Sequence, residues 1–513
     1  MLYDDHSYEV LRSGFRWDLP EQLNMAAQCL AHPSEQIAIY DLQNGETSYA
    51  KLEAMSATLA LKLTQKGIKR GDRVGVLRSQ DAWTAAAHLA IWSLGAISVP
   101  LFTLFKADAL STRTQDADIS LIITDHVNAA RDMSAPALVP DALEITLGDK
   151  LEIARTGPET PACLIYTSGT TGAPKGALHG HKMLTGHLPG VEMSHNFLGQ
   201  PEDCLWTPAD WAWIGGLFDV LMPGLALGVP VVAARLTKFT PEACLAVLAQ
   251  TPIRNVFFPP TALRMLKAAD VEIKGLRSVA SGGEPLGAEM LEWGQRAFEL
   301  MINEFYGQTE CNMIASSASD LFAARANCIG KPVPGFELTV LNDAGEPTFT
   351  EGDIAVRKGA ASMMLEYWQR PDATAEKFKG EWMLTGDRGI WEGDYLHFVG
   401  REDDVITSSG YRIGPSEIED CLLAHDAVAT VGVIGKPDPL RTEIVKAYVV
   451  LKEGIEPCCE VRVNLQAFVK ERLATYSYPR EIEFLECLPM TVTGKVIRKE
   501  LKARACAELE GAQ

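Results

Sequence analysis

The stretch that most constrains this chain is a polar loop placed directly after a buried strand. An apolar run, Ala162-Cys-Leu-Ile165, is followed by Tyr166-Thr-Ser-Gly-Thr-Thr-Gly-Ala-Pro-Lys-Gly176. Glycines let backbone N–H groups approach an anion closely, hydroxyls add donors, and Lys175 adds a point charge. The loop is not a Walker A loop, because Lys175 is followed by Gly176 rather than by Ser or Thr. The pattern predicts a polyphosphate-binding loop at the end of a strand, and a flexible surface linker is the structural alternative.

Two kinds of segment follow one another along the first third of the chain. Apolar runs typical of strands, such as residues 71–77 and 96–100, alternate with helical runs, such as residues 48–55 and 84–94. This alternation predicts parallel sheets flanked by helices. Residues 329–399 instead hold short runs punctuated by Gly and Pro, which predict a smaller β-rich subdomain. Because 513 residues are too many for one core, we expect two or three domains in an α/β (α+β overall) protein.

Charge and cysteine content argue against several classes of partner. The chain has 47 Lys and Arg against 67 Asp and Glu, a formal net charge of −20. Such an acidic excess disfavours nucleic acid or an anionic membrane as the main partner, but it is compatible with an anionic substrate in a local basic pocket. The start of the chain lacks the features of a signal peptide, and no uncharged apolar run approaches the roughly 18 residues of a membrane helix. The 11 cysteines contain no Cys-x-x-Cys pair, so we expect reduced thiols in a cytoplasmic protein rather than a zinc or redox site.

Three further stretches have the composition of ligand-binding turns. The run Trp206-Thr-Pro-Ala-Asp-Trp-Ala-Trp-Ile-Gly-Gly-Leu-Phe218 predicts aromatic walls beside a gap, with an aromatic core cluster as the alternative. The turn Ser281-Gly-Gly-Glu-Pro-Leu286 follows a short strand and could present backbone to a flat ligand. The strand in Met301-Ile-Asn-Glu-Phe-Tyr-Gly-Gln-Thr-Glu310 ends in polar groups. Ligands often bind at the carboxyl ends of parallel strands, so we expect these stretches to meet.

Five motifs, in this order along the chain, resemble the adenylate-forming superfamily of acyl-CoA synthetases, adenylation domains and luciferases. They are the loop at residues 166–176, Tyr306-Gly-Gln-Thr-Glu310, Thr385-Gly-Asp387, the charged and Gly-rich segment at residues 400–419, and Thr493-Gly-Lys495. The likeness covers the whole chain. It is greatest to the medium-chain acyl-CoA synthetases, through the Ser281 turn, Asp404-Val-Ile-Thr-Ser-Ser-Gly-Tyr-Arg-Ile-Gly-Pro-Ser-Glu417 and Tyr478-Pro-Arg480.

The resemblance implies a domain organisation and a reaction. A large N-terminal AMP-binding domain would span residues 1–400, with the β-rich subdomain at about 329–399. A hinge at residues 401–404 would join it to a small, mobile C-terminal α+β domain at residues 405–513. A carboxylic acid would attack the α-phosphate of ATP with Mg²⁺ to give acyl-AMP and pyrophosphate, and the thiol of coenzyme A would then attack the acyl-AMP.

The resemblance also assigns roles at the nucleotide. Glu310 would coordinate Mg²⁺, Thr309 would touch the α-phosphate, and Lys495 would bridge the carboxylate and the α-phosphate. One fixed cation in a dry site is commonly worth about 10²–10³ in rate. The residues that would bind the phosphates, adenine and ribose come from four of the five motifs and from neighbouring strand ends: Thr167, Ser168, Gly169, Thr170, Thr171, Lys175, Gly283, Glu284, Pro285, Glu304, Gln308, Asp387 and Arg401.

Other positions matched to the family concern the thiol step. Asp403 matches the hinge position, with a solvated turn charge as the alternative, and Gly410 would line the path of the thiol. Arg412, Lys470 and Arg472 are candidates for the phosphates of coenzyme A, although a charged helix face also explains the two residues at 470 and 472.

The acyl pocket is predicted from two missing side chains. Relatives specific for acetate and propionate carry a tryptophan at the position of Gly307 and often a valine at that of Gly282. Two glycines should deepen the pocket, so we expect an acid longer or bulkier than propionate, either medium-chain or aromatic. The expected walls are Trp211, Trp213, Ile214, Gly215 and Gly216.

Three alternatives to an acyl-CoA synthetase are considered. A standalone adenylation enzyme that loads an acyl carrier protein would have the same motifs. A non-enzymatic descendant should have lost Lys495, Glu310 or Asp387, and all three are present. A luciferase-type oxidation is the third alternative.

Overall fold

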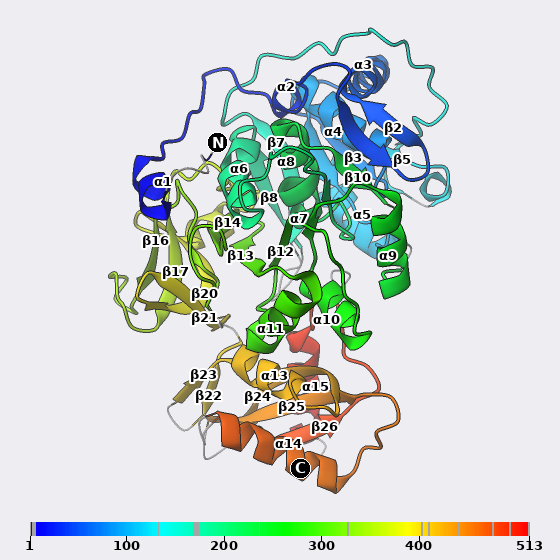
Figure 1. The fold of residues 1–513 in the computed structure, drawn as a ribbon. Coiled ribbons are helices and arrows are strands. Elements are labelled where there is room, and N and C mark those ends of the chain that lie inside the picture. Colours follow the sequence, from blue (N-terminus) through cyan, green and yellow to red (C-terminus); the bar gives the residue numbers. More distant parts are fainter. Residues whose placement is uncertain are drawn as a thin grey trace.

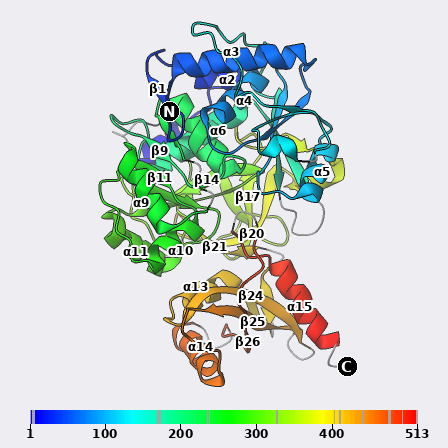
Figure 2. The same ribbon diagram turned by 90° about the vertical axis from the view of Figure 1, so that its right-hand side faces the viewer.

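The computed structural model describes most of the chain and shows two domains, one above the other in Figures 1 and 2. The described residues are 2, 7–131, 133–167, 174–234, 236, 238–325, 328–401, 404–408, 411–438, 442–473, 477–491 and 494–510.

Two sheets form the centre of the N-terminal domain, and both have parallel inner strands. In the described part of the chain the first sheet has the order β15-β14-β13-β12-β11-β9-β10-β1-β2, and the second has the order β18-β8-β7-β4-β3-β5-β6. Strands at the edges pair antiparallel, as β13 does with β14 and β7 with β8. The first sheet consists of β1 (Ile37–Asp41), β2 (Gly45–Ser48), β9 (Leu205–Trp206), β10 (Val231–Ala233), β11 (Asn255–Phe257), β12 (Ser278–Gly282), β13 (Ile302–Gln308), β14 (Cys311–Ser316) and β15 (Lys331–Pro332). The second consists of β3 (Arg73–Leu77), β4 (Ile97–Pro100), β5 (Ile119–Thr124), β6 (Ala137–Leu138), β7 (Pro161–Thr167), β8 (Lys175–Gly180) and β18 (Glu366–Tyr367).

Helices lie between the sheets and on their outer faces. Between the sheets lie α2 (Met25–Cys29), α4 (Ala82–Ser93), α6 (Lys182–Ser194) and α8 (Met222–Leu227), and α3 (Tyr49–Gln65) packs against α4. The helices α4 and α6 are buried almost all round, which is why their sequences are apolar or small on every side. On the other face of the first sheet pack α9 (Pro241–Gln250), α10 (Pro260–Ala268) and α11 (Gly287–Phe298), while α5 (Ala107–Asp116) covers the second. The predicted serine cap is also present, since the Ser48 hydroxyl accepts a hydrogen bond from the N–H of Lys51 at the start of α3.

An antiparallel β-subdomain follows, as the sequence predicted. It contains β16 (Leu338–Leu341), β17 (Gly352–Arg357), β19 (Phe378–Lys379), β20 (Trp382–Glu392) and β21 (Tyr395–Arg401), with α12 (Pro371–Glu376) before β19. The first helix of the chain, α1 (Tyr8–Gly14), packs into its core through Tyr8 and Leu11. Nothing in the sequence indicated this contact between the start of the chain and a distant subdomain.

The C-terminal domain has its own sheet and its own core. Its described strands are β22 (Ile406–Ser408), β23 (Tyr411–Ile413), β24 (Val428–Asp438), β25 (Thr442–Leu451) and β26 (Glu481–Phe484). The helices are α13 (Pro415–Leu423), α14 (Cys459–Arg472) and α15 (Arg498–Glu510). The proposed hinge falls between β21 and β22. In Figure 1, α13 and α15 lie below α10 and α11 of the N-terminal domain. These features confirm the predicted fold class.

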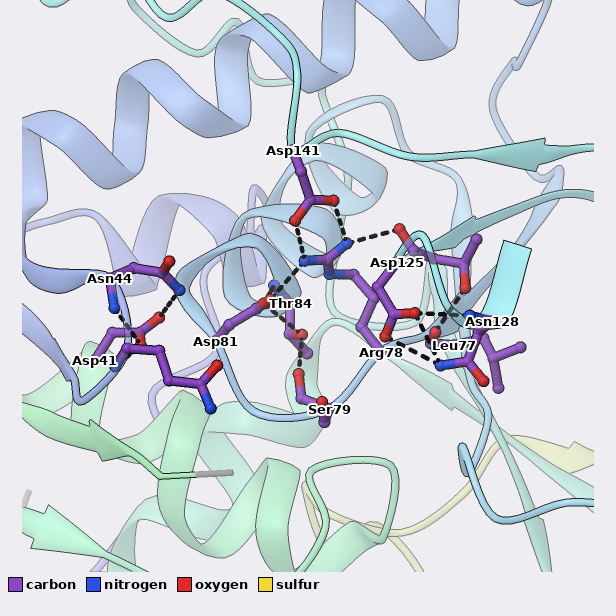
Figure 3. A network of polar contacts seen from close by, with 12 residues as sticks. Asp41, Asn44, Leu77, Arg78, Ser79, Asp81, Thr84, Asp125, Asn128 and Asp141 are labelled. Atoms are coloured by element: carbon purple, nitrogen blue, oxygen red, sulfur yellow. Dashed lines mark hydrogen bonds and ion pairs between the residues drawn. The ribbon is translucent and has the colours of Figure 1, made fainter. Parts of the chain in front are cut away.

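A buried ion-pair network fixes the carboxyl end of β3. Arg78 forms ion pairs with Asp81 at 2.5 Å and with Asp141 at 2.8 Å, and it donates to the carbonyl of Thr124 at 2.6 Å (Figure 3). Asp81 also caps α4 by accepting from the N–H of Thr84 at 2.7 Å. Because two carboxylates and one backbone carbonyl bind the same buried guanidinium, this network joins β3, β5 and α4 at one edge.

Gln80, two residues after Arg78, connects this edge to the aromatic stretch at residues 206–218. The amide of Gln80 donates to the carbonyls of Thr207 and Ala209 at 3.1 and 2.5 Å, and it accepts from the N–H of Ala234 at 3.1 Å. The loop that carries Trp211 and Trp213 is therefore held by the second sheet. Within the described residues, no helix has both the length and the apolar character needed to cross a bilayer.

Candidate active site

The predicted phosphate loop connects β7 and β8 as a hairpin. Thr167 and Lys175 are opposite each other at its base, and the Thr167 hydroxyl donates to the carbonyl of Lys175 at 3.3 Å. The tip of the loop, with Ser168, Gly169, Thr170 and Thr171, lies outside the described residues. The ammonium of Lys175 lies 5.4 Å from the ring centre of Tyr367, so the base of the loop is held beside β18.

Tyr367 also binds the candidate magnesium ligand. Its hydroxyl donates to Oε1 of Glu310 at 2.5 Å, and Glu310 is buried at the turn between β13 and β14. Lys175 and Glu310 come from different sheets, and both contact this one tyrosine. Tyr367 was missed in the sequence, because a tyrosine in a two-residue strand gives no local signal.

The candidate ribose ligand, Asp387, lies on β20 and is held by β13. The hydroxyl of Tyr306 donates to Oδ2 of Asp387 at 2.5 Å, and the amide of Gln308 donates to the same oxygen at 3.4 Å and to the carbonyl of Thr385 at 2.9 Å. Burial raises the pKa of Asp387, while the Tyr306 hydrogen bond and the cations of Arg401 and Lys495 act in the opposite direction. The two motifs that contain Tyr306 and Asp387 therefore form one unit.

A second lysine that the sequence did not reveal completes this unit. Lys377 donates to Oε1 of Gln308 at 2.9 Å and to the carbonyl of Thr385 at 3.0 Å. Burial lowers the pKa of Lys377, although the carboxylates of Glu310 and Asp387 favour its charged form. Lys377 thus links the Gln308 strand end to the strand that carries Asp387.

The predicted adenine turn begins where β12 ends. Gly283 has φ +103°, a conformation that a side chain would strain, and its neighbour Glu284 is bound by Arg264 at 2.9 Å. Ser281 is in register with Glu304 on β13. Burial, together with the facing carboxylate of Asp420 in the C-terminal domain, raises the pKa of Glu304 to about 8. At neutral pH this side chain is therefore mainly protonated.

The turn of the C-terminal domain that carries Lys495 reaches into this site. The Cε atom of Lys495 lies 3.9 Å from the position of a Cβ atom built on Gly283, and Gly494 packs against Thr261 of α10. The surrounding protein lowers the pKa of Lys495 by desolvation, and Arg401 acts in the same direction, whereas Glu284 and Asp387 raise it. Lys495 is exposed, so the place beside Gly283 and Lys495 is open to solvent and is not part of a closed core; it is called the cleft below.

The predicted acyl walls differ in how they meet this cleft. The ring of Trp213 lies 3.5 Å from the Cβ position of Gly283, and Gly215 packs directly on that ring. Trp211 is fully buried, and Ile214 and Gly216 are also buried, with the Cβ position of Gly216 against the carbonyl of Asp210. Trp213 is therefore the tryptophan next to Gly283 and Lys495.

The two glycines that suggested a deep pocket have close neighbours. A Cβ atom on Gly282 would lie 2.6 Å from the ring of Phe305, and one on Gly307 would lie 2.4 Å from the backbone nitrogen of Met313 and 2.5 Å from Oδ1 of Asn312. The space expected from the missing side chains is thus taken by Phe305 and Asn312. The sequence did not reveal them as pocket residues, since both contacts depend on the local path of β13 and β14.

Two of the residues assigned to the thiol step, Lys470 and Arg472, have described side chains, and both lie on α14. Asp403, Gly410 and the side chain of Arg412 lie outside the described part of the chain. Lys470 is exposed on α14, with its ammonium 4.0 Å from the ring centre of Tyr478, and α14 lies on the side of its domain away from the N-terminal domain (Figures 1 and 2). A charged groove on the C-terminal domain, between Lys446, Arg462 and Glu508, contains none of the predicted site residues.

Comparison with sequence families identifies the family of the chain. The sequence model of the AMP-binding enzyme matches residues 25–368, and that of the AMP-binding enzyme C-terminal domain matches residues 417–495. The chain belongs to the AMP-binding enzyme family. This confirms the resemblance found in the motifs, and with it the expectation of an AMP-forming acid–thiol ligase of the acyl-CoA synthetase type.

Relatives of this family match nearly the whole chain. The acetyl-coenzyme A synthetase of Bacillus subtilis (strain 168) is 32% identical over 466 residues, which cover 85% of this chain and 81% of that protein. The mitochondrial acyl-coenzyme A synthetase ACSM3 of Rattus norvegicus is 30% identical over 544 residues, covering 97% and 93%. The crystal structure of the anthranilate CoA ligase AuaEII with anthranoyl-AMP is similar with a TM-score of 0.86 and 26% identity, covering 97% of this chain and 99% of that one. A benzoate CoA ligase from Burkholderia xenovorans LB400 gives a TM-score of 0.80 at 26% identity, with 93% and 99% covered.

Proposed function

We propose that this enzyme activates a medium-chain fatty acid or an aromatic carboxylic acid, in preference to acetate, with ATP and Mg²⁺, and then transfers the acyl group to coenzyme A. The observation that carries the proposal is the position of Lys495. It comes from the C-terminal domain and lies beside Gly283 and Trp213, near Asp387 and Arg401. A cation at this point can draw together two anions, the carboxylate and the α-phosphate.

The nucleotide roles follow from the same arrangement. The phosphate loop, with Lys175 at its base, would hold the β- and γ-phosphates, and the backbone of Gly283 to Pro285 would lie along adenine, near Glu304. Asp387 would accept the ribose hydroxyls, with Arg401 at the ribose–phosphate end and Thr309 at the α-phosphate. Little covalent chemistry is asked of the protein, so positioning and fixed charge supply the catalysis.

The chemistry of the residues present fits a magnesium ion. Mg²⁺ is usually bound through one or two carboxylates together with substrate phosphates. Glu310 supplies one carboxylate, and Tyr367 fixes one of its oxygens beside Lys175. When bound, the ion would neutralise charge on the phosphates, and Glu310 would hold it there.

Aromatic side chains support the choice of acid. Trp213, Phe257 and Phe305 form a row of rings, with ring centres 5.6 Å and 5.1 Å apart. Trp213 is half-buried and rests on the buried rings of Phe257 and Phe305, so the face that it turns to the site is apolar, which favours an aromatic ring or an alkyl chain over the single methyl group of acetate. Relatives named for acetate, anthranilate and benzoate show how widely the acid varies at similar overall structure.

The acceptor and the thiol step form the second half of the proposal. With Lys495 in the cleft, the C-terminal domain must move before a thiol can enter, and the hinge at residues 401–404, with Asp403, would allow this. Gly410 would then line the path of the thiol, and Arg412 and Lys470 would meet the phosphates of coenzyme A. A carrier protein in place of coenzyme A is the alternative acceptor.

The cytoplasm is the compartment we propose. All 11 cysteines are free thiols, including the adjacent pair Cys458 and Cys459. Free thiols persist in reducing compartments. Fractionation of cells that express the tagged protein would test this location.

Pyrophosphate release tests the function directly. The purified enzyme is assayed with ATP, Mg²⁺ and acids from acetate to dodecanoate, plus benzoate and phenylacetate, each with coenzyme A, with a carrier protein, or with neither. We expect release that depends on coenzyme A and is highest with medium-chain or aromatic acids. A maximum at acetate would refute the acid preference, and dependence on the carrier protein alone would refute the acceptor.

A further inference from the structure

Three side chains with metal-binding atoms meet near the turn of the hairpin formed by β20 and β21. Cys328 precedes β15, Glu392 is the last residue of β20, and His397 lies on β21. The Cys328 sulfur, one ring nitrogen of His397 and one carboxylate oxygen of Glu392 all lie within 4.8 Å of one another. The proposed reaction uses none of these three residues.

Backbone pairing holds the cluster together. Cys328 and His397 face each other in an antiparallel bridge. In the hairpin, His397 is opposite Ile390 and Glu392 is opposite Tyr395, so His397 and Glu392 are diagonal neighbours on one face. The three side chains are therefore brought together by the pairing of the strands that carry them.

The distances between the three groups are close to those of ligands around a zinc ion. Sγ of Cys328 lies 3.6 Å from Oε2 of Glu392, and Nδ1 of His397 lies 3.5 Å from Oε1 of the same carboxylate. Zinc binds sulfur at about 2.3 Å and nitrogen or oxygen at about 2.0–2.2 Å, so two ligands of a tetrahedral ion are about 3.3–3.6 Å apart. The three groups would need to move little to bind the ion.

The histidine nitrogen that faces the carboxylate lacks a hydrogen bond. Nδ1 of His397 is buried and has no hydrogen-bond partner among the described residues, because its contact with Glu392 at 3.5 Å does not have hydrogen-bond geometry. In the same part of the chain, the Glu392 carboxylate forms no ion pair with a Lys or Arg. A buried polar atom without a partner calls for an explanation, and a metal ion would use the lone pair of this nitrogen.

Exposure and ligand chemistry indicate which ion the cluster suits. Cys328 is 2% exposed, whereas the side chains of His397 and Glu392 are 27% and 53% exposed, so an ion can enter from solvent on their side. A thiol together with an imidazole and a carboxylate favours Zn²⁺, since Mg²⁺ and Ca²⁺ prefer ligands that are all oxygen. The cluster therefore differs in chemistry from the candidate magnesium ligand, Glu310.

We propose that Cys328, Glu392 and His397 bind a zinc ion, which links the segment before β15 to the hairpin of β20 and β21. On binding, the Cys328 thiol would release its proton to solvent, and Glu392 would supply one or both of its oxygens. The other end of the same hairpin holds Asp387 in register with Arg401. The ion would thus stabilise the framework of the candidate ribose site without touching the nucleotide.

Such a site has no signature in the sequence. Cys328 and Glu392 are 64 positions apart in the chain, and the absence of a Cys-x-x-Cys pair argues only against sites built from neighbouring cysteines. A zinc ion at this place would overturn the expectation, based on that absence, that the thiols bind no metal.

Titration with Zn²⁺ alone tests the site, and because it uses neither ATP nor acid, its outcome is independent of the proposed function. The protein is the full chain, treated with a chelator, in which serine replaces the exposed cysteines that could bind zinc adventitiously: Cys458, Cys459, Cys487 and Cys506. We expect one Zn²⁺ per chain with a Kd of about 1 µM or tighter, unaffected by excess Mg²⁺. Absence of zinc binding, or binding that Mg²⁺ abolishes, would overturn the proposal.

Conservative variants in this four-serine protein locate the ion. Cys328→Ser, His397→Gln and Glu392→Gln should each weaken zinc binding by about 100-fold or more, because each removes a ligand. Cys163→Ser is the matched control, since the Cys163 thiol is also buried but contacts the hydroxyl of Ser98 and no carboxylate. Full affinity in any of the three ligand variants would overturn the site as proposed.

Two further measurements do not depend on the value of the affinity. With Co²⁺ as the probe, thiolate-to-metal charge-transfer absorption should appear in the four-serine protein and be absent when Cys328→Ser is added. Zinc should also raise the melting temperature of the four-serine protein. Glu392→Gln changes a half-exposed side chain, so it should fold normally and lose that rise. A cobalt complex without the thiolate band, or an equal rise with and without Glu392, would contradict the proposal.

Discussion

The Cε atom of Lys495 lies 3.9 Å from the position that a Cβ atom on Gly283 would occupy, although the two residues belong to different domains. Trp213 packs on the same glycine at 3.5 Å. A side chain at Gly283 would therefore be strained by its positive φ and would also crowd the lysine and the tryptophan. In the proposed function this arrangement would suit adenylate formation, and the lysine would have to move away before a thiol could reach the acyl-AMP.

Replacing Lys495 with Ala should separate the two half-reactions. We expect adenylate formation to fall by about 10²–10³ or more, because a fixed cation at the reacting groups is lost. Thioester formation from supplied acyl-AMP should stay close to that of the wild type. Pyrophosphate release and thioester formation would be measured separately, and an equal loss in both would contradict the assigned role.

Gly494 offers a test of domain docking that leaves the charge of Lys495 intact. It has φ +83°, and a Cβ atom there would lie 2.8 Å from the methyl group of Thr261. Gly494→Ala should therefore slow adenylate formation and spare the thioester step. Adding Thr261→Ser, which removes that methyl group, should restore part of the lost rate. A single variant with normal adenylate formation would show that this contact does not hold the turn in place.

The alkaline side of the pH profile of adenylate formation should reflect the ionisation of Lys495. Its pKa is lowered by desolvation, so in the free enzyme the ammonium loses its proton at a lower pH than an ordinary lysine does. The value of kcat/KM for adenylate formation should consequently fall as the pH rises through this lowered pKa. In Lys495→Arg, whatever activity is left should not show this fall, because a guanidinium stays charged. An alkaline fall that persists in the arginine variant must come from another group.

The acid side of the pH profile should reflect the ionisation of Asp387, which in its proposed role would accept both ribose hydroxyls only as a carboxylate. Burial raises its pKa, and the hydrogen bond from Tyr306 opposes that rise. Tyr306→Phe removes the opposing hydrogen bond, so the pKa of Asp387 rises further and kcat/KM for ATP should be lost at a higher pH than in the wild type. Tyr166→Phe is a matched control, since the Tyr166 hydroxyl also donates to a carboxylate, that of Asp116, and not to Asp387. An acid limb that does not move in Tyr306→Phe would argue against Asp387 as the titrating group.

The sequence predicted those parts of the site that have a local pattern. A strand followed by Gly, Ser, Thr and Lys predicted the hairpin that ends in Lys175, and the polar end of β13 predicted the placing of Gln308 and Glu310. Alternation of strands and helices predicted the two sheets. The position of Lys495 was predicted from the family resemblance alone. The sequence of a turn in one domain does not show which part of the other domain that turn will contact.

The remaining contacts depend on how distant strands are aligned. Tyr367, Lys377 and Asn312 are single residues whose importance comes from a partner far away in the chain. Gly282 and Gly307 are a second example of this dependence. The sequence shows that both positions lack a side chain, but it does not show that Phe305 and Asn312 pack into the space. The pairing of β13 with β14 has a bulge between Tyr306 and Gln308, beside Gly307, and a bulge does not follow from the period of the sequence.

Lys377 gives the last prediction, which separates binding of the nucleotide from binding of the acid. Its ammonium makes hydrogen bonds of 2.9 and 3.0 Å to Gln308 and Thr385, and so ties the end of β13 to the strand that carries Asp387. Hydrogen bonds to a charged group contribute about 1.5–3 kcal/mol, so Lys377→Met should raise KM for ATP by about 10–100-fold. KM for the acid should change little, since the lysine binds Gln308 and Thr385 beside the candidate ribose ligand Asp387.

The neighbouring lysine provides the control for this variant. Lys379 is exposed on β19 and, among the described residues, donates only to the carbonyl of Asp343, at 3.2 Å. Lys379→Met therefore removes the same charge two residues away and should leave both KM values unchanged. Steady-state kinetics with each substrate varied in turn would measure the effect. If Lys377→Met raised both KM values alike, the lysine would act on the general stability of the domain, which a lowered melting temperature would show. A rise confined to ATP places the effect at the ribose, because Gln308 and Asp387 are the groups that the lysine aligns.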